Sequence, residues 1–421
     1  MGRLDASEGA GRTLIAPVSC RKRPRTRQNP EYLMPDQTYS TTAMIERLIA
    51  FDTTSRNSNL ELIHFVRDYL AGHGIESDLI HDETGEKANL YATIGPKCDG
   101  GVVLSGHTDV VPVDGQDWDS PPFTARHKDG LIYGRGTSDM KSFIAIVLAL
   151  VPEMKQRNFK IPLHLAFSYD EEVGCIGAHG LVPNISIPGA RPKAAIVGEP
   201  TSMRVVNAHK GINSFITTVT GFEAHSSATH QGVNAIVYAA ELIGFLNDLA
   251  EEFKANPEPN SRFDPPYTSV QIGTIKGGTA LNIIPRECTF VWEFRDIPGT
   301  DTQAIVDRFN EFAENTVLPK MKMVSDEAAI DTQVRAKVRG LVPENGSAAE
   351  TLVMALARAN QTYTAAYGTE AGIFQEAGVP TVVCGPGDIA QAHKPNEFIA
   401  VSQIDECTDF LHRLMDHAET P

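Results

Sequence analysis

Short apolar runs that alternate with helical stretches constrain the fold of this 421-residue chain most strongly. The runs cover residues 101–104, 163–167, 194–197 and 381–384, and helical patterns cover residues 42–51, 59–70 and 140–154. Runs that are apolar on both faces are typical of strands in a parallel sheet, because helices cover both sides of such a sheet. The pattern therefore predicts an α/β fold, with a mixed, mostly parallel sheet flanked by helices.

A different order of elements interrupts this pattern at residues 209–318. We expect a strand at 214–220, a helix at 233–253, strands at 268–275 and 287–295, and a helix at 301–314. This order is typical of a ferredoxin-like α+β domain. The α/β pattern then resumes and ends in an amphipathic helix. We therefore expect an inserted domain that divides the larger domain into residues 41–208 and 319–421.

The first 40 residues form a separate compositional unit. Residues 1–33 carry seven Lys or Arg against three Asp or Glu, whereas the whole chain has a formal net charge of −16. With no periodic apolar pattern, residues 1–40 are expected to be a basic, disordered head. No apolar segment of a secretion signal is present. A targeting role and a true start at Met34 both stay open.

Composition also excludes several classes of partner. Nucleic acid and anionic membranes repel an acidic protein, and no apolar run reaches the roughly 18 residues that a membrane span needs. The six cysteines show no CxxC spacing, which favours free thiols in a reducing cytosol over disulfides or a cysteine-bound metal. We therefore expect a soluble, cytoplasmic protein that acts on a small molecule.

Side chains that can bind metal ions follow each of the four apolar runs. In chain order these are His107, Asp109, Glu171, Glu172, Glu199 and His393. A further acid, Asp139, precedes the helical pattern at 140–154. Ligands of α/β proteins bind outside the carboxyl ends of the strands, so we expect these side chains to lie close together.

The chemistry of this set fits a pair of divalent ions. Histidine nitrogen and carboxylate oxygen suit Zn²⁺ or Co²⁺, and one carboxylate can bridge two ions. Two histidines and three carboxylates supply two terminal ligands for each ion and one bridge, and a fourth carboxylate remains as a base. Asp109 follows His107 by two residues in an extended segment. Its side chain therefore points the same way and can orient the imidazole.

Four segments carry a resemblance to a known family. They are residues 107–112 (HTDVVP), 134–141 (GRGTSDMK), 170–174 (DEEVG) and 198–201 (GEPT). These segments closely resemble the dizinc aminoacylase and carboxypeptidase family of metallopeptidases, and the resemblance extends over residues 41–417. It implies a zinc-peptidase-like α/β domain with an inserted lid that makes the contact of a homodimer.

The resemblance assigns a role to each metal-binding side chain. It implies that His107 and Glu199 hold one ion, that Glu172 and His393 hold the other, and that Asp139 bridges them. The implied cofactor is a pair of divalent ions, Zn²⁺ or alternatively Co²⁺.

The same resemblance implies how the reaction proceeds. Glu171 is the implied general base, Asp109 supports the site through His107, and the peptide bond between Asp139 and Met140 is implied to be cis. His225, in segment 221–227, corresponds to a lid histidine that stabilises the developing oxyanion, often from the partner subunit.

Four further positions match substrate-binding residues of the family. They are Asn282, Arg295, Gly368 and Thr369. Arg295 is suited to a bidentate grip on a substrate carboxylate, with a salt bridge to Glu293 or Asp296 as its competing role.

Segments 368–375 and 382–399 indicate the substrate within the family. They resemble the branch that hydrolyses N2-acetyl-L-ornithine to L-ornithine and acetate, a step of arginine biosynthesis, although Asp388 stands where a serine is expected. From charge alone, Glu370 or Asp388 is a candidate to face the cationic end of ornithine.

Other functions stay open at this point. One is hydrolysis of a different amide, by a succinyl-diaminopimelate desuccinylase, another N-acyl amino acid hydrolase or a dipeptidase. A succinyl group favours an additional Arg or Lys, which the C-terminal segments do not supply. The other is a non-catalytic binding protein with the same fold. Such a protein is expected to lack some of the metal-binding side chains or the general base. Dinucleotide binding is disfavoured because Gly174, Gly177 and Gly180 form GxxGxxG and not GxGxxG.

Overall fold

The computed structural model describes residues 38–185 and 191–421. Most of the predicted basic head therefore lies outside the described residues. The boundary predicted at residue 41 is slightly late, because Ser40 caps α1 (Thr41–Ile49) by accepting a hydrogen bond from the backbone of Ala43. The ring of Tyr39 also packs edge-on against Phe65.

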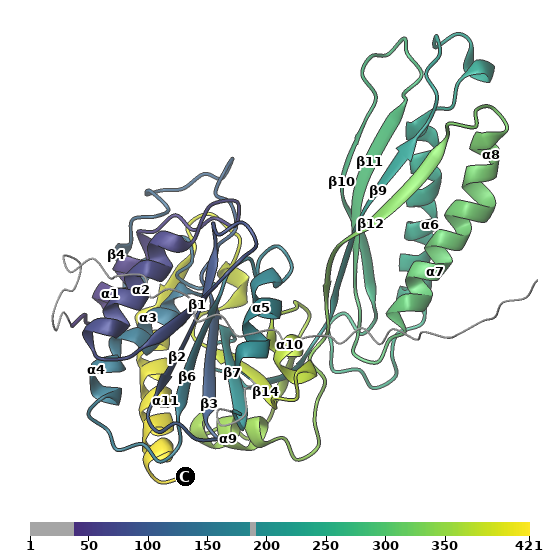
Figure 1. The fold of residues 1–421 in the computed structure, drawn as a ribbon. Coiled ribbons are helices and arrows are strands. Elements are labelled where there is room, and N and C mark those ends of the chain that lie inside the picture. The colour runs from purple at the N-terminus through teal and green to yellow at the C-terminus, as the bar shows by residue number, and fades with distance from the viewer. Residues whose placement is uncertain (1–37, 186–190) are drawn as a thin grey trace, which may run out of the picture. The chain divides into compact units, whose positions relative to one another are not determined.

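A mixed eight-stranded sheet forms the centre of the larger domain, as predicted (Figure 1). Its strands, in spatial order, are β1 (Ser77–His81), β2 (Ala88–Ile94), β6 (Leu163–Ser168), β3 (Val102–His107), β7 (Ala194–Pro200), β14 (Thr381–Gly385), β8 (Val206–His209) and β13 (Tyr363–Ala365). The four central strands β6, β3, β7 and β14 run parallel, so their carboxyl ends meet at one edge. A separate small sheet contains β15 (Phe398–Ala400), β5 (Leu131–Tyr133) and β4 (Arg126–Lys128).

Helices cover both faces of the large sheet. They are α1, α2 (Leu60–Gly72), α3 (Lys141–Ala149), α4 (Val151–Met154), α5 (Ile176–Ile185), α9 (Ala348–Leu356), α10 (Ala371–Glu376) and α11 (Val401–Glu419). Neighbouring residues of β3 alternate between two separate cores: Leu104 packs with α1, α3 and α11, whereas Val103 packs with α5 and α10. This two-sided burial explains why the strands appear in the sequence as continuous apolar runs.

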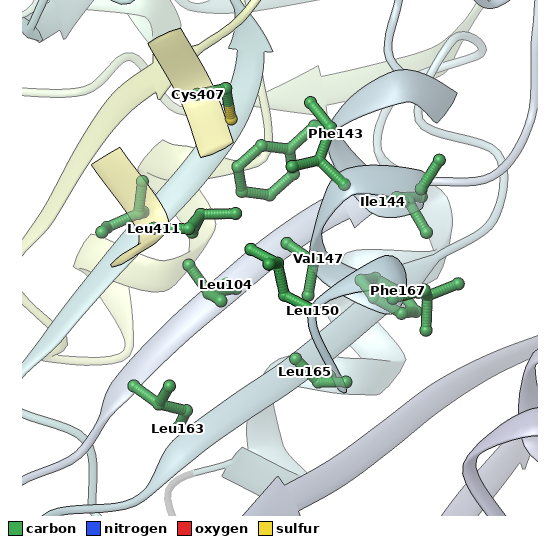
Figure 2. Close-up of a cluster of buried hydrophobic side chains, with 14 of the residues drawn as sticks. Leu104, Phe143, Ile144, Val147, Leu150, Leu163, Leu165, Phe167, Cys407 and Leu411 are labelled. Carbon is green, nitrogen blue, oxygen red and sulfur yellow. The ribbon is translucent and has the colours of Figure 1, made fainter. Parts of the chain in front are cut away.

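The core fixes the start of α3 against the sheet. Figure 2 shows Phe143 and Val147 of α3 packed among Leu104 of β3 and Leu411 of α11. The approach is so close that a methyl group at Gly198 in β7 would lie 2.1 Å from the ring of Phe143. Packing at this density positions the residues just before α3, which include Asp139.

The inserted domain has the predicted ferredoxin-like architecture. Its elements are β9 (Ile212–Thr220), the short helix η2 (Thr229–Gln231), α6 (Ala235–Ala255), β10 (Ser269–Gly277), β11 (Glu287–Arg295), α7 (Thr302–Phe312), a π-helical turn (Ala313–Val317), α8 (Leu318–Lys322) and β12 (Ala329–Val338). The antiparallel strands have the order β10-β11-β9-β12, and the helices lie on one face of them (Figure 1). Phe215 and Trp292 stack in the core between them, with ring centroids 4.5 Å apart.

One predicted boundary of this domain is wrong. The sequence pattern predicts an end at residue 318 and places the next segment in the larger domain. Strand β12 instead pairs with β9 along its whole length and completes the βαββαβ unit. Without β12, β9 would be an edge strand with unpaired backbone groups. Pairing with β12 places β9 inside the sheet.

Two other expectations can be compared with the described residues. In that part of the chain no helix is long and apolar enough to span a membrane. Five cysteines are described; all are free thiols, and all but Cys98 are buried.

Candidate metal centre

The predicted metal ligands gather at the carboxyl edge of the parallel strands. His107 is the last residue of β3, Glu199 lies near the end of β7, and Glu172 follows β6. His393 lies in the loop after β14, beyond the short helix η4 (Ile389–Gln391). Each side chain therefore occupies the place expected from the apolar run that precedes it.

Asp139 lies between the two histidines. One carboxylate oxygen, Oδ1, is 3.0 Å from Nε2 of His107, and the other, Oδ2, is 3.4 Å from Nε2 of His393. The peptide bond between Asp139 and Met140 is cis, as the resemblance implies. A carboxylate with a separate imidazole beside each oxygen has the arrangement of a bridge between two ions.

A second carboxylate accompanies each histidine. Glu199 Oε1 is 3.5 Å from Nε2 of His107, and Glu172 Oε2 is 3.0 Å from Nε2 of His393. Ligand atoms of His107, Asp139 and Glu172 lie within 4.8 Å of one another, as do those of His107, Glu171 and Glu199. The side chains thus form two overlapping sets of nitrogen and oxygen donors.

The orientation of His107 is set by its other ring nitrogen. Nδ1 is 2.9 Å from the backbone carbonyl oxygen of Asp109 and 3.5 Å from its carboxylate. The carbonyl is thus the closer acceptor, where the sequence analysis expected the carboxylate. A proton on Nδ1 leaves the lone pair of Nε2 directed at Asp139 and Glu199.

The carboxylate of Asp109 instead organises the loop after β6. It accepts hydrogen bonds from the hydroxyl of Ser55 at 2.7 Å, from the backbone N–H of Glu171 at 3.0 Å and from that of Glu172 at 3.3 Å. Asp109 therefore holds both the candidate base and a candidate ligand in position.

The protein groups alone leave this cluster electrostatically unbalanced. Burial, together with neighbouring carboxylates, raises the pKa of Glu171 to about 8 and that of Glu172 to about 7. Burial and Asp139 also raise the pKa of Glu199 well above its ordinary value. Crowded carboxylates of this kind ionise together only when cations lie among them.

An unsatisfied ligand atom supports the same conclusion. Oε1 of Glu199 is buried and has no hydrogen-bond partner among the described residues. Buried polar atoms are almost always paired, so such an atom beside an imidazole nitrogen is well suited to a metal ion. The donor set therefore fits divalent ions of the zinc type.

The candidate base has a defined environment. Glu171 is buried, and its Oε1 accepts a weak hydrogen bond from the thiol of Cys175 at 3.3 Å. Gly174, with a φ of +118°, lets the loop between these residues turn away from β6.

One buried carboxylate of the centre escaped the sequence analysis. Glu397 accepts hydrogen bonds from Arg135 at 2.7 Å and from the backbone N–H groups of Gly136, Ser138 and Asp139 at 2.9, 2.7 and 3.0 Å. It thereby fixes the loop that carries Asp139. The only signal in the sequence was an acid directly before an apolar triplet, close to His393.

A cavity of about 240 Å³ adjoins the cluster. Its wall includes Glu171, Glu172 and His393 together with the predicted substrate contacts Arg295 and Gly368. The guanidinium of Arg295 is 3.0 Å from the carboxylate of Glu293, so the competing salt bridge is formed within the pocket wall.

Two other candidates of the C-terminal segment are turned inward. The hydroxyl of Thr369 is buried, lies 3.1 Å from His209 and accepts from the N–H of Ala371, which favours support of the loop over contact with substrate. Glu370 is buried against Ser105 and Ser168. The idea that Glu370 faces a cationic substrate end is therefore wrong. Charge alone suggested it, and charge does not reveal burial.

His225 and Asn282 lie together within the inserted domain, and neither belongs to the ligand clusters or to the cavity beside them. His225 forms an isolated β-bridge with Ile283, and the backbone of Ser226 donates to the carbonyl oxygen of Asn282. Both predicted side chains are exposed. Nδ1 of His225 is engaged by Ser227 at 2.8 Å, which leaves Nε2 as its outward nitrogen.

Comparison with known proteins agrees with this geometry. The model of peptidase family M20/M25/M40 matches residues 103–417. An acetylornithine deacetylase from Myxococcus xanthus is 37% identical over 89% of this chain and 96% of its own length. One from Pasteurella multocida is 32% identical over 90% and 96%, respectively. An M20 family metallo-carboxypeptidase from Sulfolobus solfataricus shares the fold, with a TM-score of 0.71, 16% identity and coverage of 91% and 100%.

Proposed function

The chain belongs to peptidase family M20/M25/M40, and from this we propose that it hydrolyses the N2-acetyl amide of N2-acetyl-L-ornithine to L-ornithine and acetate. The observation that carries the reaction type is the position of Asp139, with an imidazole beside each of its oxygens and the buried acid Glu171 nearby. The substrate is supported by relatives that cover nearly the whole chain. A desuccinylase, a dipeptidase and a non-catalytic protein have no comparable support.

The centre is proposed to hold two divalent ions. His107 and Glu199 would bind one, His393 and Glu172 the other, and Asp139 would bridge them. The oxygen and nitrogen donors suit Zn²⁺ best and also accept Co²⁺. Such ions, when bound, polarise an amide carbonyl and lower the pKa of water toward about 7.

Glu171 is proposed to carry the proton transfer. It takes a proton from the attacking water and passes it to the leaving nitrogen, while the C–N bond breaks and the acyl group leaves as acetate. Burial favours the neutral form of this carboxyl, so the proton can be held between the two steps. Cys175 and the backbone contacts to Asp109 keep the side chain in place.

The inserted domain is proposed to serve as a lid and as the contact of a homodimer. The support is that His225 and Asn282 are exposed within one chain. In a dimer, Nε2 of His225 would donate a hydrogen bond to the oxyanion in the partner's centre. We also propose a cytoplasmic location, because the substrate belongs to biosynthetic metabolism.

Recognition of the amino acid is proposed to use the cavity beside the centre. Arg295 would bind the substrate carboxylate, and Gly368 would leave room for it. Asp388 remains the candidate for the cationic end. It is exposed and lines a neighbouring cavity of about 360 Å³ together with Tyr367, which also lines the cavity of Arg295.

A substrate comparison tests this proposal. Protein reconstituted with Zn²⁺ or Co²⁺ is assayed on N2-acetyl-L-ornithine, N-succinyl-diaminopimelate and a dipeptide. We expect kcat/KM to be highest for N2-acetyl-L-ornithine. A clear preference for the succinyl compound or the dipeptide would contradict the proposed substrate while leaving the reaction type intact.

A further inference from the structure

Arg335 lies at a bulge in β12 that the sequence pattern does not predict. Val334 pairs with Phe215 of β9 and Ala336 pairs with the preceding Ser214, so Arg335 has no opposite residue. A bulge redirects the side chain of the extra residue, and bulges are frequent beside active sites. Arg335 lines the same cavity as Glu171 and Glu172.

The strand that carries Arg335 touches the loop of the candidate base. A methyl group at Gly174 would lie 2.5 Å from the side chain of Ala336, a distance that real side chains do not adopt. Glycine at this position therefore allows β12 to pack directly on the loop that follows Glu171 and Glu172. The contact places the bulged residue at the wall of the centre.

Arg335 is not engaged by the acids that line this cavity. Three acids line it, Glu171, Glu172 and Glu293, and Glu293 pairs with Arg295 at 3.0 Å. Arg335 is exposed and forms no ion pair or side-chain hydrogen bond with any residue in 38–185 or 191–421. Because a guanidinium stays charged at every working pH, Arg335 is a cation that forms no ion pair with any described residue.

We propose that Arg335 is a specificity-determining residue that binds the α-carboxylate of the N-acyl amino acid. The inference rests on the proposed function, because it assumes an amide substrate of this class. The α-carboxylate is attached to the carbon that bears the scissile nitrogen, so its binding cation has to lie close to the base and the metal ligands. Arg335 meets this requirement and would bind the carboxylate together with Arg295, whose charge is shared with Glu293.

Substrates with and without the carboxylate test the assignment. N-acetylputrescine is N2-acetyl-L-ornithine without its carboxylate. We expect Arg335→Ala to lower kcat/KM for N2-acetyl-L-ornithine by about 10- to 100-fold and for N-acetylputrescine by less than about 2-fold. Arg335→Lys should give an intermediate kcat/KM for N2-acetyl-L-ornithine, since lysine keeps the charge but cannot form the two parallel hydrogen bonds of a guanidinium. The inhibition constant of N-acetylputrescine reports its binding independently of turnover.

Lys337 provides the matched control. It is a cation of the same strand but lines a different cavity, so Lys337→Ala should leave both substrates within about 2-fold. Equal losses on both substrates in Arg335→Ala, or no loss on either, would overturn the assignment. If the wild type does not hydrolyse N2-acetyl-L-ornithine, the proposed function fails. The Arg335 comparison is then made with the preferred N-acyl amino acid and its decarboxylated analogue.

Discussion

At the scale of single residues, the acids of the candidate centre are held in position by two further buried carboxylates. Glu397 accepts three backbone N–H groups around Asp139 and pairs with the buried Arg135. Asp109 does the same for the loop of Glu171 and Glu172. The positions of the donor atoms are therefore set by a second layer of carboxylates.

Glu397→Gln is expected to disturb both stability and metal binding. The change leaves Arg135 as an uncompensated buried charge, which costs about 3–5 kcal/mol of the free energy of unfolding. Loosening of the loop around Asp139 should weaken Zn²⁺ binding by about 10- to 100-fold. Denaturant unfolding and chelator competition measure the two effects. Glu46→Gln, which removes an exposed partner of His127, is the control and should change neither. Wild-type values for Glu397→Gln would show that the loop does not need this carboxylate.

Glu171→Gln and Glu172→Gln separate the base from the ligands. We expect Glu171→Gln to fold and retain both ions while kcat falls by about 10²- to 10⁴-fold. Glu172→Gln, one residue away, should lose an ion as well as activity. Metal content and kcat are measured on the same preparations. Retained activity in Glu171→Gln would remove this residue from the mechanism.

That the candidate ligands gather in one place was predictable, because all of them except Asp139 follow strands of the parallel sheet. His107, Glu199 and His393 could be placed from that rule alone. The inward direction of Thr369 and Glu370 could not, since it depends on contacts with His209, Ser105 and Ser168 in other elements. Arg335 was missed because a bulge has no signal in the local pattern.

At the scale of elements, the connection between the two domains contains a buried acid. Asp296 directly follows β11, and its carboxylate accepts from the side chain of Asn213 at 2.7 Å. Its backbone carbonyl accepts from Gly211, just before β9. Burial raises the pKa of Asp296 to about 6 from the ordinary 3.8.

This shift predicts a pH-dependent effect of Asp296→Asn. Because the folded pKa is above the unfolded one, the native protein binds the proton more tightly, and stability falls as pH rises from about 4 to about 6. Asparagine carries no charge at any pH. The variant should therefore match the wild type near pH 4 and be more stable near pH 8 by on the order of 2–3 kcal/mol. Unfolding in denaturant at several pH values measures the difference. A difference that does not change with pH would contradict the buried charge.

Strand β12 shows where prediction of elements failed. Its outward positions carry Asp331, Arg335 and Lys337, and only Val338 is buried, so the apolar alternation is weak. Pairing with β9, which lies far away in the sequence, decides its domain. By contrast β11, with alternate residues buried, was placed correctly from its pattern alone.

At the scale of the whole molecule, the crowded acids should make folding depend on metal. Ions that bind only the folded protein stabilise it by about 4 kcal/mol at a thousandfold excess over Kd. Chelation is therefore expected to lower Tm and abolish activity, and Zn²⁺ or Co²⁺ should restore both. Glu172→Gln, with its weakened centre, should show a smaller change in Tm. A Tm that chelators do not affect in the wild type would argue against ions in this cluster.

The architecture as a whole was largely predictable because two different patterns occur in one chain. Two-sided apolar runs gave the central sheet, and the half-buried alternation of β9 and β11 gave the inserted domain. The outer strands were not located individually: β1 is short and partly exposed, β13 has only three residues, and the buried β2 was not among the predicted apolar runs.

The central claim is that this protein uses two ions, bridged by Asp139, to hydrolyse an N-acetyl amino acid. The most direct measurement titrates metal-depleted protein with Zn²⁺ and follows bound metal together with acetate release from N2-acetyl-L-ornithine. We expect two ions to bind per chain, and we expect Asp139→Ala to lose both tight binding and activity. Full activity in the metal-depleted protein, or binding of a single ion that Asp139→Ala leaves unchanged, would contradict the claim.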